Sequence, residues 1–143
     1  MTKFGPEPCG NSPSGAGKSA ATVLVVDDEP LARWSIAEVL GERGYRVAQA
    51  ADATSALQAI AAADKVPDAL LLDLRLPDSR DLTALSVIHR LFPRMAIVLM
   101  TAHGSPELFA EALRRGAVGV VDKPFETSDL EPLVERALAV ASC

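Results

Sequence analysis

The stretch Ala69-Leu70-Leu71-Leu72-Asp73 decides the fold, because four apolar residues in a row end in a carboxylate. Pro67-Asp68 precedes the run and Pro77-Asp78 follows it closely, so turn residues bound it on both sides. A short continuous apolar run of this kind is typical of a strand that is buried on both faces of a parallel sheet. Asp73 would then stand at the C-terminal end of that strand, where open parallel sheets bind their ligands.

Three other apolar runs share this arrangement, and each ends in residues that carry a charge or a hydroxyl. Residues 23–26 lead into Asp27 and Asp28, residues 97–100 lead into Thr101, and residues 118–121 lead into Asp122-Lys123-Pro124. Parallel strands bring their carboxyl ends to one edge of a sheet, so carboxylates, a hydroxyl and an ammonium group would meet there. This convergence is the strongest functional signal in the sequence.

Helical patterns alternate with these runs. The sequence predicts helices over roughly 30–43, 52–63, 82–91, 105–116 and 127–140, and a more mixed strand over 45–50. The alternation favours an α/β fold with a doubly wound, five-stranded parallel sheet and helices on both faces. With the strands numbered along the chain, we expect the order 2-1-3-4-5, because the mixed second strand belongs at an edge.

Length and composition restrict the class of protein. The 143 residues are 49% hydrophobic and 23% charged, with a formal net charge of −5, which is the balance of one globular domain. No basic run stands out and no apolar stretch is long enough for a membrane span, so we expect neither direct nucleic-acid binding nor membrane insertion. Cys9 and Cys143 lie near opposite ends and make a poor disulfide framework, which favours a reducing, cytoplasmic location.

Residues 1–21 are rich in glycine, proline and serine, and we interpret them as a disordered tail before a domain over 22–143. The segment Ser14-Gly15-Ala16-Gly17-Lys18-Ser19 resembles half of a phosphate-binding loop. The full motif needs a glycine where this chain has Ser12, and it should follow a strand and open a helix. We therefore interpret this segment as a linker, with a P-loop enzyme as the less favoured alternative.

The carboxylates expected at the sheet edge suit a particular chemistry. Asp27, Asp28 and Asp73 would lie within a few ångströms of one another, and like charges that close raise each other's pKa unless a cation joins them. A small set of oxygen ligands suits Mg²⁺, which keeps several waters and often bridges to a phosphate. With Lys123 as a second cation and Thr101 as a hydroxyl donor, the site could carry a phosphoryl group on a carboxylate nucleophile.

Taken together, these motifs resemble the receiver domain of two-component response regulators, with its flavodoxin-like fold. The resemblance covers about residues 22–140 and rests on four motifs: Val25-Val26-Asp27-Asp28-Glu29-Pro30, Leu72-Asp73-Leu74-Arg75-Leu76-Pro77, Met100-Thr101-Ala102-His103 and Asp122-Lys123-Pro124-Phe125. Residues 33–35 and 116–125 look most like the receivers of nitrogen-regulation-type enhancer-binding activators.

The resemblance implies a role for each matched residue. Asp73 would be the phosphoacceptor, Thr101 the switch hydroxyl, and Lys123 the cation that binds the phosphoryl group. Mg²⁺ would be held at four positions: Asp28 and Asp73 directly, the backbone carbonyl of Arg75, and Asp27 mainly through a water. The peptide bond between Lys123 and the following proline is expected to be cis.

Two positions depart from the usual receiver pattern. Val120 stands where receivers usually carry Tyr or Phe, and Asp81 stands near the start of the third helix where they usually carry Gly. Val120 is too short for an aromatic switch, so we expect activation to act through Thr101 on residues 102–106 and the helix that follows. Asp81 implies a different loop geometry after Asp73.

The function that the resemblance implies is a phosphorelay switch. A sensor histidine kinase would phosphorylate Asp73, and the switch would regulate an output domain or partner, expected to be transcriptional, with a homodimer as a further possible assembly. The chain would catalyse its own phosphorylation and dephosphorylation only. Two alternatives stay open: an aspartyl-nucleophile phosphatase, which should have an acid where Arg75 stands, and a phosphorylation-independent dimerisation module, which a loss of acidic residues would favour.

Overall fold

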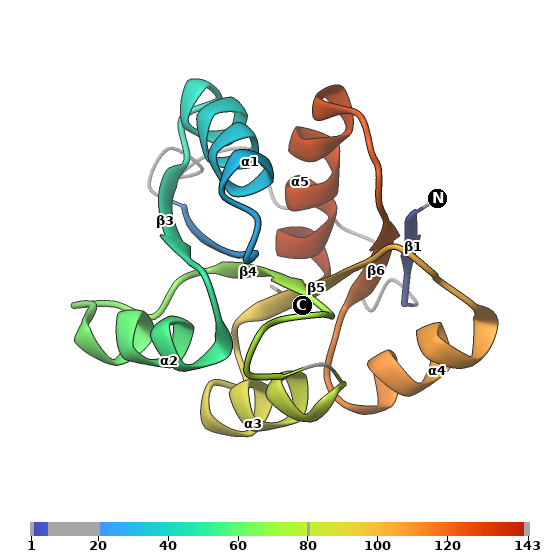
Figure 1. Ribbon diagram of the computed structural model, residues 1–143. Helices are drawn as coiled ribbons and strands as arrows, with labels where there is room; N and C mark the ends of the chain where they lie inside the picture. Colours follow the sequence, from blue (N-terminus) through green and yellow to red (C-terminus); the bar gives the residue numbers. More distant parts are fainter. Residues whose placement is uncertain (1, 6–20, 80, 142–143) are drawn as a thin grey trace.

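The computed structural model of the protein describes residues 2–5, 21–79 and 81–141. Its elements in chain order are β1 (Thr2–Phe4), β2 (Thr22–Val26), α1 (Pro30–Glu42), β3 (Arg46–Ala50), α2 (Ala53–Ala62), β4 (Ala69–Asp73), α3 (Thr83–Leu91), β5 (Ala96–Thr101), α4 (Pro106–Arg114), β6 (Gly119–Asp122), a 3₁₀ turn (Thr127–Asp129) and α5 (Leu130–Ala141). Figure 1 shows these helices on both faces of one sheet. The predicted doubly wound α/β fold is confirmed. The phosphate-loop-like segment 14–19 and both cysteines lie outside the described residues.

The sheet has six strands in the order β1-β6-β5-β4-β2-β3. Strands β2 to β6 pair in parallel, whereas β1 pairs antiparallel with β6 at the edge of the sheet. The prediction of a five-stranded sheet is therefore wrong, and so is the disordered tail over Thr2–Phe4. A three-residue strand has too little pattern to be recognised in the sequence, and only the unpaired edge of β6 gives it a partner.

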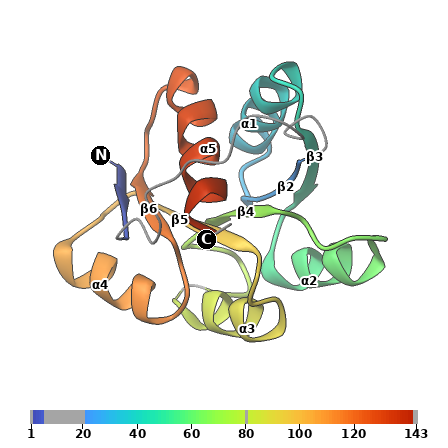
Figure 2. The ribbon, with the colours of Figure 1, turned by 180° about the vertical axis from the view of Figure 1, so that it is seen from behind.

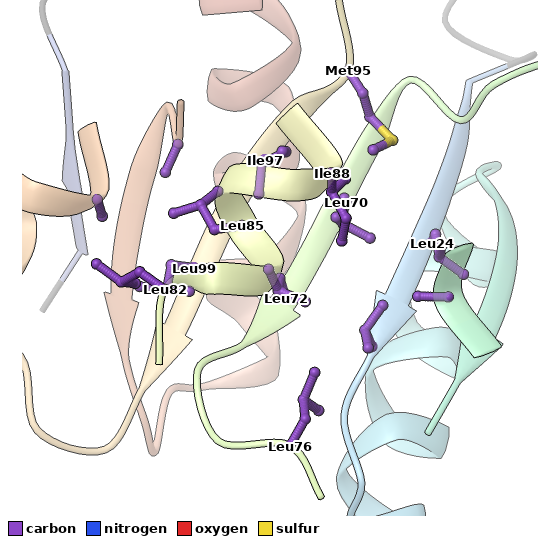
Figure 3. Packing of buried hydrophobic residues seen from close by; sticks show 14 of the residues in the cluster. Leu24, Leu70, Leu72, Leu76, Leu82, Leu85, Ile88, Met95, Ile97 and Leu99 are labelled. Carbon is purple, nitrogen blue, oxygen red and sulfur yellow. The ribbon is translucent and has the colours of Figure 1, made fainter. Parts of the chain in front are cut away.

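Successive side chains of each strand point to opposite faces of the sheet. On one face, Leu70 and Leu72 pack in a cluster that includes residues of α2, α3 and α4 (Figure 3). On the other face, Leu71 packs with residues of α1 and α5. Figures 1 and 2 show the same division of the helices between the two faces. Strand β4 is thus buried on both faces, as its unbroken apolar sequence predicts.

Local signals set the ends of the helices. Pro30 occupies the first turn of α1, and the Ser105 side chain caps α4 by accepting the N–H of Leu108 at 3.0 Å. Helices α1 and α4 are followed by Gly44 and Gly116, whose φ angles of 97° and 115° favour glycine. Within the described part of the chain, no helix has the length and apolar character needed to cross a membrane.

Candidate functional site

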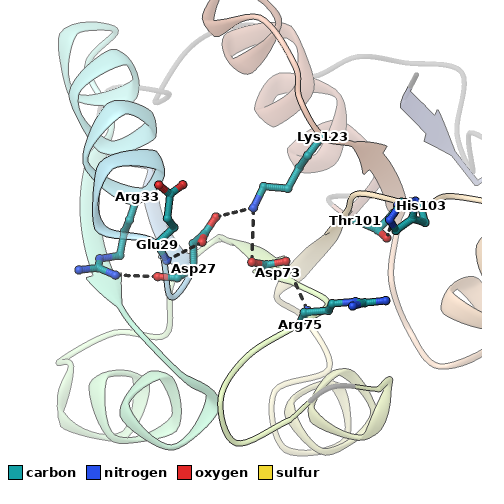
Figure 4. A network of polar contacts seen from close by, with 8 residues as sticks. All are labelled: Asp27, Glu29, Arg33, Asp73, Arg75, Thr101, His103 and Lys123. Atoms are coloured by element: carbon teal, nitrogen blue, oxygen red, sulfur yellow. Dashed lines mark hydrogen bonds and ion pairs between the residues drawn. The ribbon is translucent and has the colours of Figure 1, made fainter.

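The carboxyl ends of three strands bring charged side chains together at one edge of the sheet. Asp27 follows β2 directly, Asp73 is the last residue of β4, and Lys123 follows β6 directly. Figure 4 shows Lys123 reaching between the two aspartates. Its Nζ lies 2.8 Å from Asp27 Oδ2 and 3.4 Å from Asp73 Oδ2. The convergence expected from the sequence is therefore present, although these residues are 50 and 96 positions apart along the chain.

The two aspartates differ in how completely their oxygens are used. Asp27 is fully buried, and its second oxygen, Oδ1, accepts the N–H of Glu29 at 2.9 Å. Asp73 is 8% exposed, and its Oδ1 accepts the N–H of Arg75 at 3.3 Å, which is a long hydrogen bond. Asp27 is thus held from both sides, whereas Asp73 remains the more accessible and less firmly bonded carboxylate.

Burial and neighbouring charges together set the pKa of the Asp73 carboxyl group. Burial raises the pKa of Asp73, the positive charge of Lys123 lowers it, and the negative charge of Asp27 raises it, with a net effect above the usual range. For Lys123, burial alone would lower the pKa, but the hydrogen bond to Asp27 and the charges of both aspartates raise it overall. Lys123 therefore stays an ammonium group, and the site favours a further cation that would offset the charge of Asp73.

The donor set fits a small divalent cation. Asp27, Asp28 and Asp73 each offer a carboxylate oxygen, and these oxygens lie within 4.8 Å of one another. Asp28 is exposed, so its carboxylate faces the solvent from which an ion would enter. Hard oxygen donors in this number, with room for waters, are what Mg²⁺ prefers. The backbone of Arg75 lies beside the same group through its hydrogen bond to Asp73.

Thr101, the last residue of β5, reaches the same edge of the sheet but makes different contacts. It is 3% exposed, and its Oγ1 accepts the N–H of His103 at 3.1 Å. Its carbonyl accepts the N–H of Lys123 at 2.7 Å. The Thr101 hydroxyl thus anchors the first turn of the loop that leads to α4, and its backbone positions the lysine. Figure 4 shows Thr101 and His103 together, apart from the contacts among Asp27, Asp73 and Lys123.

The two departures from the receiver pattern have structural explanations. Val120 is 5% exposed and belongs to the core cluster on the face of α2, α3 and α4. Asp81 Oδ1 accepts the N–H of Thr83 at 2.9 Å, so this carboxylate binds the first turn of α3. The peptide bond between Lys123 and Pro124 is cis, as expected.

Sequence reasoning missed two residues that hold the site in place. Arg33 Nη1 donates to the carbonyl of Asp27 at 2.6 Å, and Asp78 accepts the N–H groups of Ala53 and Thr54, both at 2.9 Å. Arg33 was detectable in principle, because it lies in the first turns of the helix that follows Asp27. Asp78 was not, since its partners in α2 are more than twenty positions away.

The chain is also similar to proteins of known sequence and structure. The nitrogen assimilation regulatory protein NtrX of Azorhizobium caulinodans is 38% identical over 121 residues, which are 83% of this chain and 26% of that protein. The chain therefore spans about a quarter of this relative. The crystal structure of the receiver domain of NtrX from Brucella abortus is 39% identical, with a TM-score of 0.73 over 81% of this chain and 97% of that one.

A further similar structure is the beryllofluoride-activated NtrC4 receiver domain dimer. It is 27% identical, with a TM-score of 0.74 over 82% of this chain and 95% of that one. A family model of the response regulator receiver domain matches residues 23–135, which include nearly all of β2, every element from α1 to β6 and the first half of α5. On this match and on the identity to NtrX, the chain belongs to the response regulator receiver domain family.

Proposed function

We propose that this protein is a phosphorelay switch in which Asp73 accepts a phosphoryl group from a sensor histidine kinase. The observation that carries the proposal is the placement of Asp73, a carboxylate at a strand end that keeps a small exposed fraction, with the Lys123 ammonium 3.4 Å from its Oδ2. A carboxylate in such a setting is a nucleophile whose product charge is neutralised in advance. Membership of the receiver family supports the same assignment.

In the proposed transfer, an Asp73 oxygen attacks phosphorus as the phosphorus–nitrogen bond of the donor phosphohistidine breaks. The imidazole leaves with the bonding electron pair and is protonated, and Asp73 becomes an acyl phosphate. Lys123 stabilises the charge on the transferred group, and Asp27 holds Lys123 in place through their 2.8 Å contact. Bound Mg²⁺ would supply further charge neutralisation, held by Asp28, Asp73 and the Arg75 carbonyl, with Asp27 acting through a water.

The phosphoryl group would be sensed through Thr101. A hydroxyl that turns toward the phosphoryl oxygens moves away from the N–H of His103, which it accepts at 3.1 Å in this structure. Residues 102–106 would then lose an anchor and carry the start of α4 with them. Val120 is short and buried, so it leaves the loop and α4 as the route of the signal.

The test is incubation with Mg²⁺ and acetyl phosphate, followed by measurement of the intact mass. We expect one added phosphoryl group on the wild type and none on Asp73→Asn, a nearly isosteric change that removes the nucleophile. Asp64→Asn, on an exposed position after α2, serves as the matched control and should behave as wild type. Uptake by Asp73→Asn at the wild-type rate would refute the assignment.

The same experiment separates the alternatives. Continuous release of phosphate without a lasting adduct would indicate an aspartyl-nucleophile phosphatase, whereas absence of uptake by a folded wild type would indicate a phosphorylation-independent dimerisation module. Arg75, where the phosphatase would need an acid, favours the switch. We therefore propose that catalysis by this chain is limited to its own phosphorylation and dephosphorylation.

Mg²⁺ binding is tested by thermal melts with and without the ion. At an ion concentration 100 times the dissociation constant, the wild type should gain about 2.7 kcal/mol in the free energy of unfolding. Asp28→Ala should lose most of that gain. In metal-free buffer it should be more stable than the wild type, because it removes like-charge repulsion around Asp73. Equal Mg²⁺ stabilisation of both proteins would exclude Asp28 as a ligand.

The proposed domain boundary, location and partners follow from membership of the receiver family. We propose that residues 22–143 form the receiver unit and that the protein works in the cytoplasm, where it regulates an output domain or partner, expected to be transcriptional. The curated relatives support this view, since the matched region is 26% of NtrX from Azorhizobium caulinodans. A homodimer is a further proposal, supported by the dimer of the activated NtrC4 receiver domain.

A further inference from the structure

The N-terminal strand lies outside the family match and contacts the half of the molecule that carries the proposed signal. We call residues 2–5, which are β1 and Gly5, the N-terminal strap. Figures 1 and 2 show β1 along the outer edge of β6, beside α4 on one face and α5 on the other. The receiver match begins at residue 23, so the strap is an addition to the matched domain.

The strap is attached to β6 by a backbone ladder. Lys3 pairs with Val120 and Phe4 with Gly119 in antiparallel register. The N–H of Gly5 extends the ladder by donating to the carbonyl of Val118 at 2.9 Å. These bonds cover the backbone edge that a terminal strand of a sheet would otherwise expose.

Side chains attach the strap to the helices on both faces. On the α4 side, Lys3 Nζ lies 5.8 Å from the centre of the Phe109 ring, and the backbone of Gly5 lies against Leu113. On the α5 side, the guanidinium of Arg136 lies 5.4 Å from the centre of the Phe4 ring. Cation–π contacts at exposed positions are weak attractions between the cation and the face of the ring. The strap therefore joins α4, β6 and α5.

Gly119 is shaped to accept the strap. A Cβ at this position would lie 2.7 Å from Cδ1 of Phe4 and 2.8 Å from the carbonyl oxygen of Lys3. The ring could turn away from such a methyl group, but the Lys3 carbonyl belongs to the ladder and could not move without breaking it. A glycine inside a strand often marks the close approach of another backbone, and here that backbone is the strap.

The attachment is weak enough to be reversible. Ordering the backbone of each residue costs conformational entropy, and a four-residue strap offsets that cost with a short ladder, two cation–π contacts and the partly buried ring of Phe4. Segments with so few contacts open at the low end of the stability range of a protein. Part of the attachment is to α4, the helix that phosphorylation is proposed to displace, so movement of α4 would remove it.

We propose that the N-terminal strap is an autoinhibitory contact that holds α4 in its unphosphorylated position. Release of the strap removes contacts that hold α4, and displacement of α4 removes contacts that hold the strap. Each of the two movements therefore favours the other. The inference rests on the proposed function in one respect, namely that phosphorylation of Asp73 is the event that displaces α4. The contact between the strap and α4 exists independently of that event.

The test is amide hydrogen exchange on the full chain without phosphoryl donor, comparing Gly119→Ala with the wild type. Gly41→Ala is the matched control, because Gly41 is exposed in α1 and a Cβ there has no neighbour within 4 Å. We expect Gly119→Ala to exchange about tenfold faster or more in residues 119–121 and in α4, and Gly41→Ala to match the wild type. Circular dichroism verifies that each variant is folded.

Phe4→Ala is the second variant, since it leaves Gly119 intact and removes the ring that Arg136 covers. It should accelerate exchange in the same segments. Faster exchange in 119–121 with an unchanged α4 in either folded variant would overturn the proposal, as would unchanged exchange of 119–121 in both.

A second comparison separates this proposal from the proposed function. Introducing Gly119→Ala into Asp73→Asn should accelerate exchange in α4 as in the wild-type background, even though the acceptor is absent. In the wild type, acetyl phosphate with Mg²⁺ should in turn accelerate exchange of residues 119–121. Failure of phosphoryl uptake would refute the acceptor assignment but leave the first result standing, whereas a strap that stays closed on phosphorylated protein would overturn the coupling.

Discussion

The loops that follow β4 and β5 differ in how firmly they are held. After β4, the N–H of Leu74 donates to the carbonyl of Met100 at 2.8 Å, and Leu76 and Ser79 exchange backbone hydrogen bonds of 2.9 and 3.2 Å. Asp78 then fastens this loop to α2 through two N–H groups and the Thr54 hydroxyl. After β5, residues 102–107 are all exposed, and the loop is anchored at its start by the hydrogen bond from His103 to Thr101.

This difference assigns the two loops to different tasks. The loop after β4 carries Arg75 beside Asp73, and transfer of a phosphoryl group needs its ligands held in one geometry. The loop after β5 is exposed over residues 102–107, so we expect a small change in free energy at Thr101 to be enough to move it. The proposed phosphoryl transfer would thus take place at the firmly held loop after β4, and the proposed response would take place in the loop after β5.

The largest effect is expected from Thr101→Ala, which removes the only side-chain link proposed between the two tasks. Phosphoryl uptake by Asp73 should persist, because the nucleophile, Lys123 and the acidic residues remain. The change in amide exchange over residues 102–114 on addition of a beryllofluoride phosphate mimic should be lost. Thr127→Ala, at an exposed position, is the matched control. A full wild-type exchange response in Thr101→Ala would show that the signal takes another route.

A smaller effect is expected from Asp78→Ala, which loosens the fixed loop. It removes acceptors from the first turn of α2 and should lower the free energy of unfolding at pH 7 by about 1 kcal/mol or less, since the carboxylate is exposed. The N–H groups of Ala53 and Thr54, with the Thr54 hydroxyl, hold the pKa of Asp78 below its usual range. Asp64→Ala is the control for loss of an exposed carboxylate.

The sign of the pH dependence follows from the lowered pKa. The stabilisation by Asp78 is fully present above the pKa of the unfolded chain, about 4, and is lost as the pH falls through the folded value. The difference between wild type and Asp78→Ala, measured by urea unfolding, should therefore be constant near neutrality and shrink below about pH 4. A difference that grows on acidification would contradict this account.

The smallest effect is expected from substituting Arg75 in the loop after β4 or His103 in the loop after β5. Arg75 and His103 are exposed and each lies two residues beyond a site residue, so their side chains should limit the approach of water to the phosphoryl group. Arg75→Ala or His103→Ala should change the rate of hydrolysis by roughly two- to fivefold, at most about 1 kcal/mol in the barrier. Uptake rates should change less. Unchanged phosphate half-lives in both variants would remove these residues from the site.

The position of the candidate site residues at one edge of the sheet could be predicted because each stands at the end of an apolar run. The pattern that makes β4 a buried strand also puts Asp73 at its tip, and the same holds for Asp27 and Thr101. Asp78 has no such signal, since its backbone partners in α2 are brought near only by folding, whereas the partner of Arg33 is only six positions away along the chain. The strap was missed for a related reason, because three residues are too few for a strand pattern.

The sequence by itself determined the order of strands and helices from β2 to α5 and the residue types at the acidic edge, because periodicity and residue type are local properties. The tertiary structure decided three features that depend on contacts between distant segments. It placed Lys123 between Asp27 and Asp73, fastened Asp78 to α2, and laid Phe4 against Gly119 at the free edge of β6. Each needs two segments that meet only after the sheet has formed, so neither segment alone carries its signal.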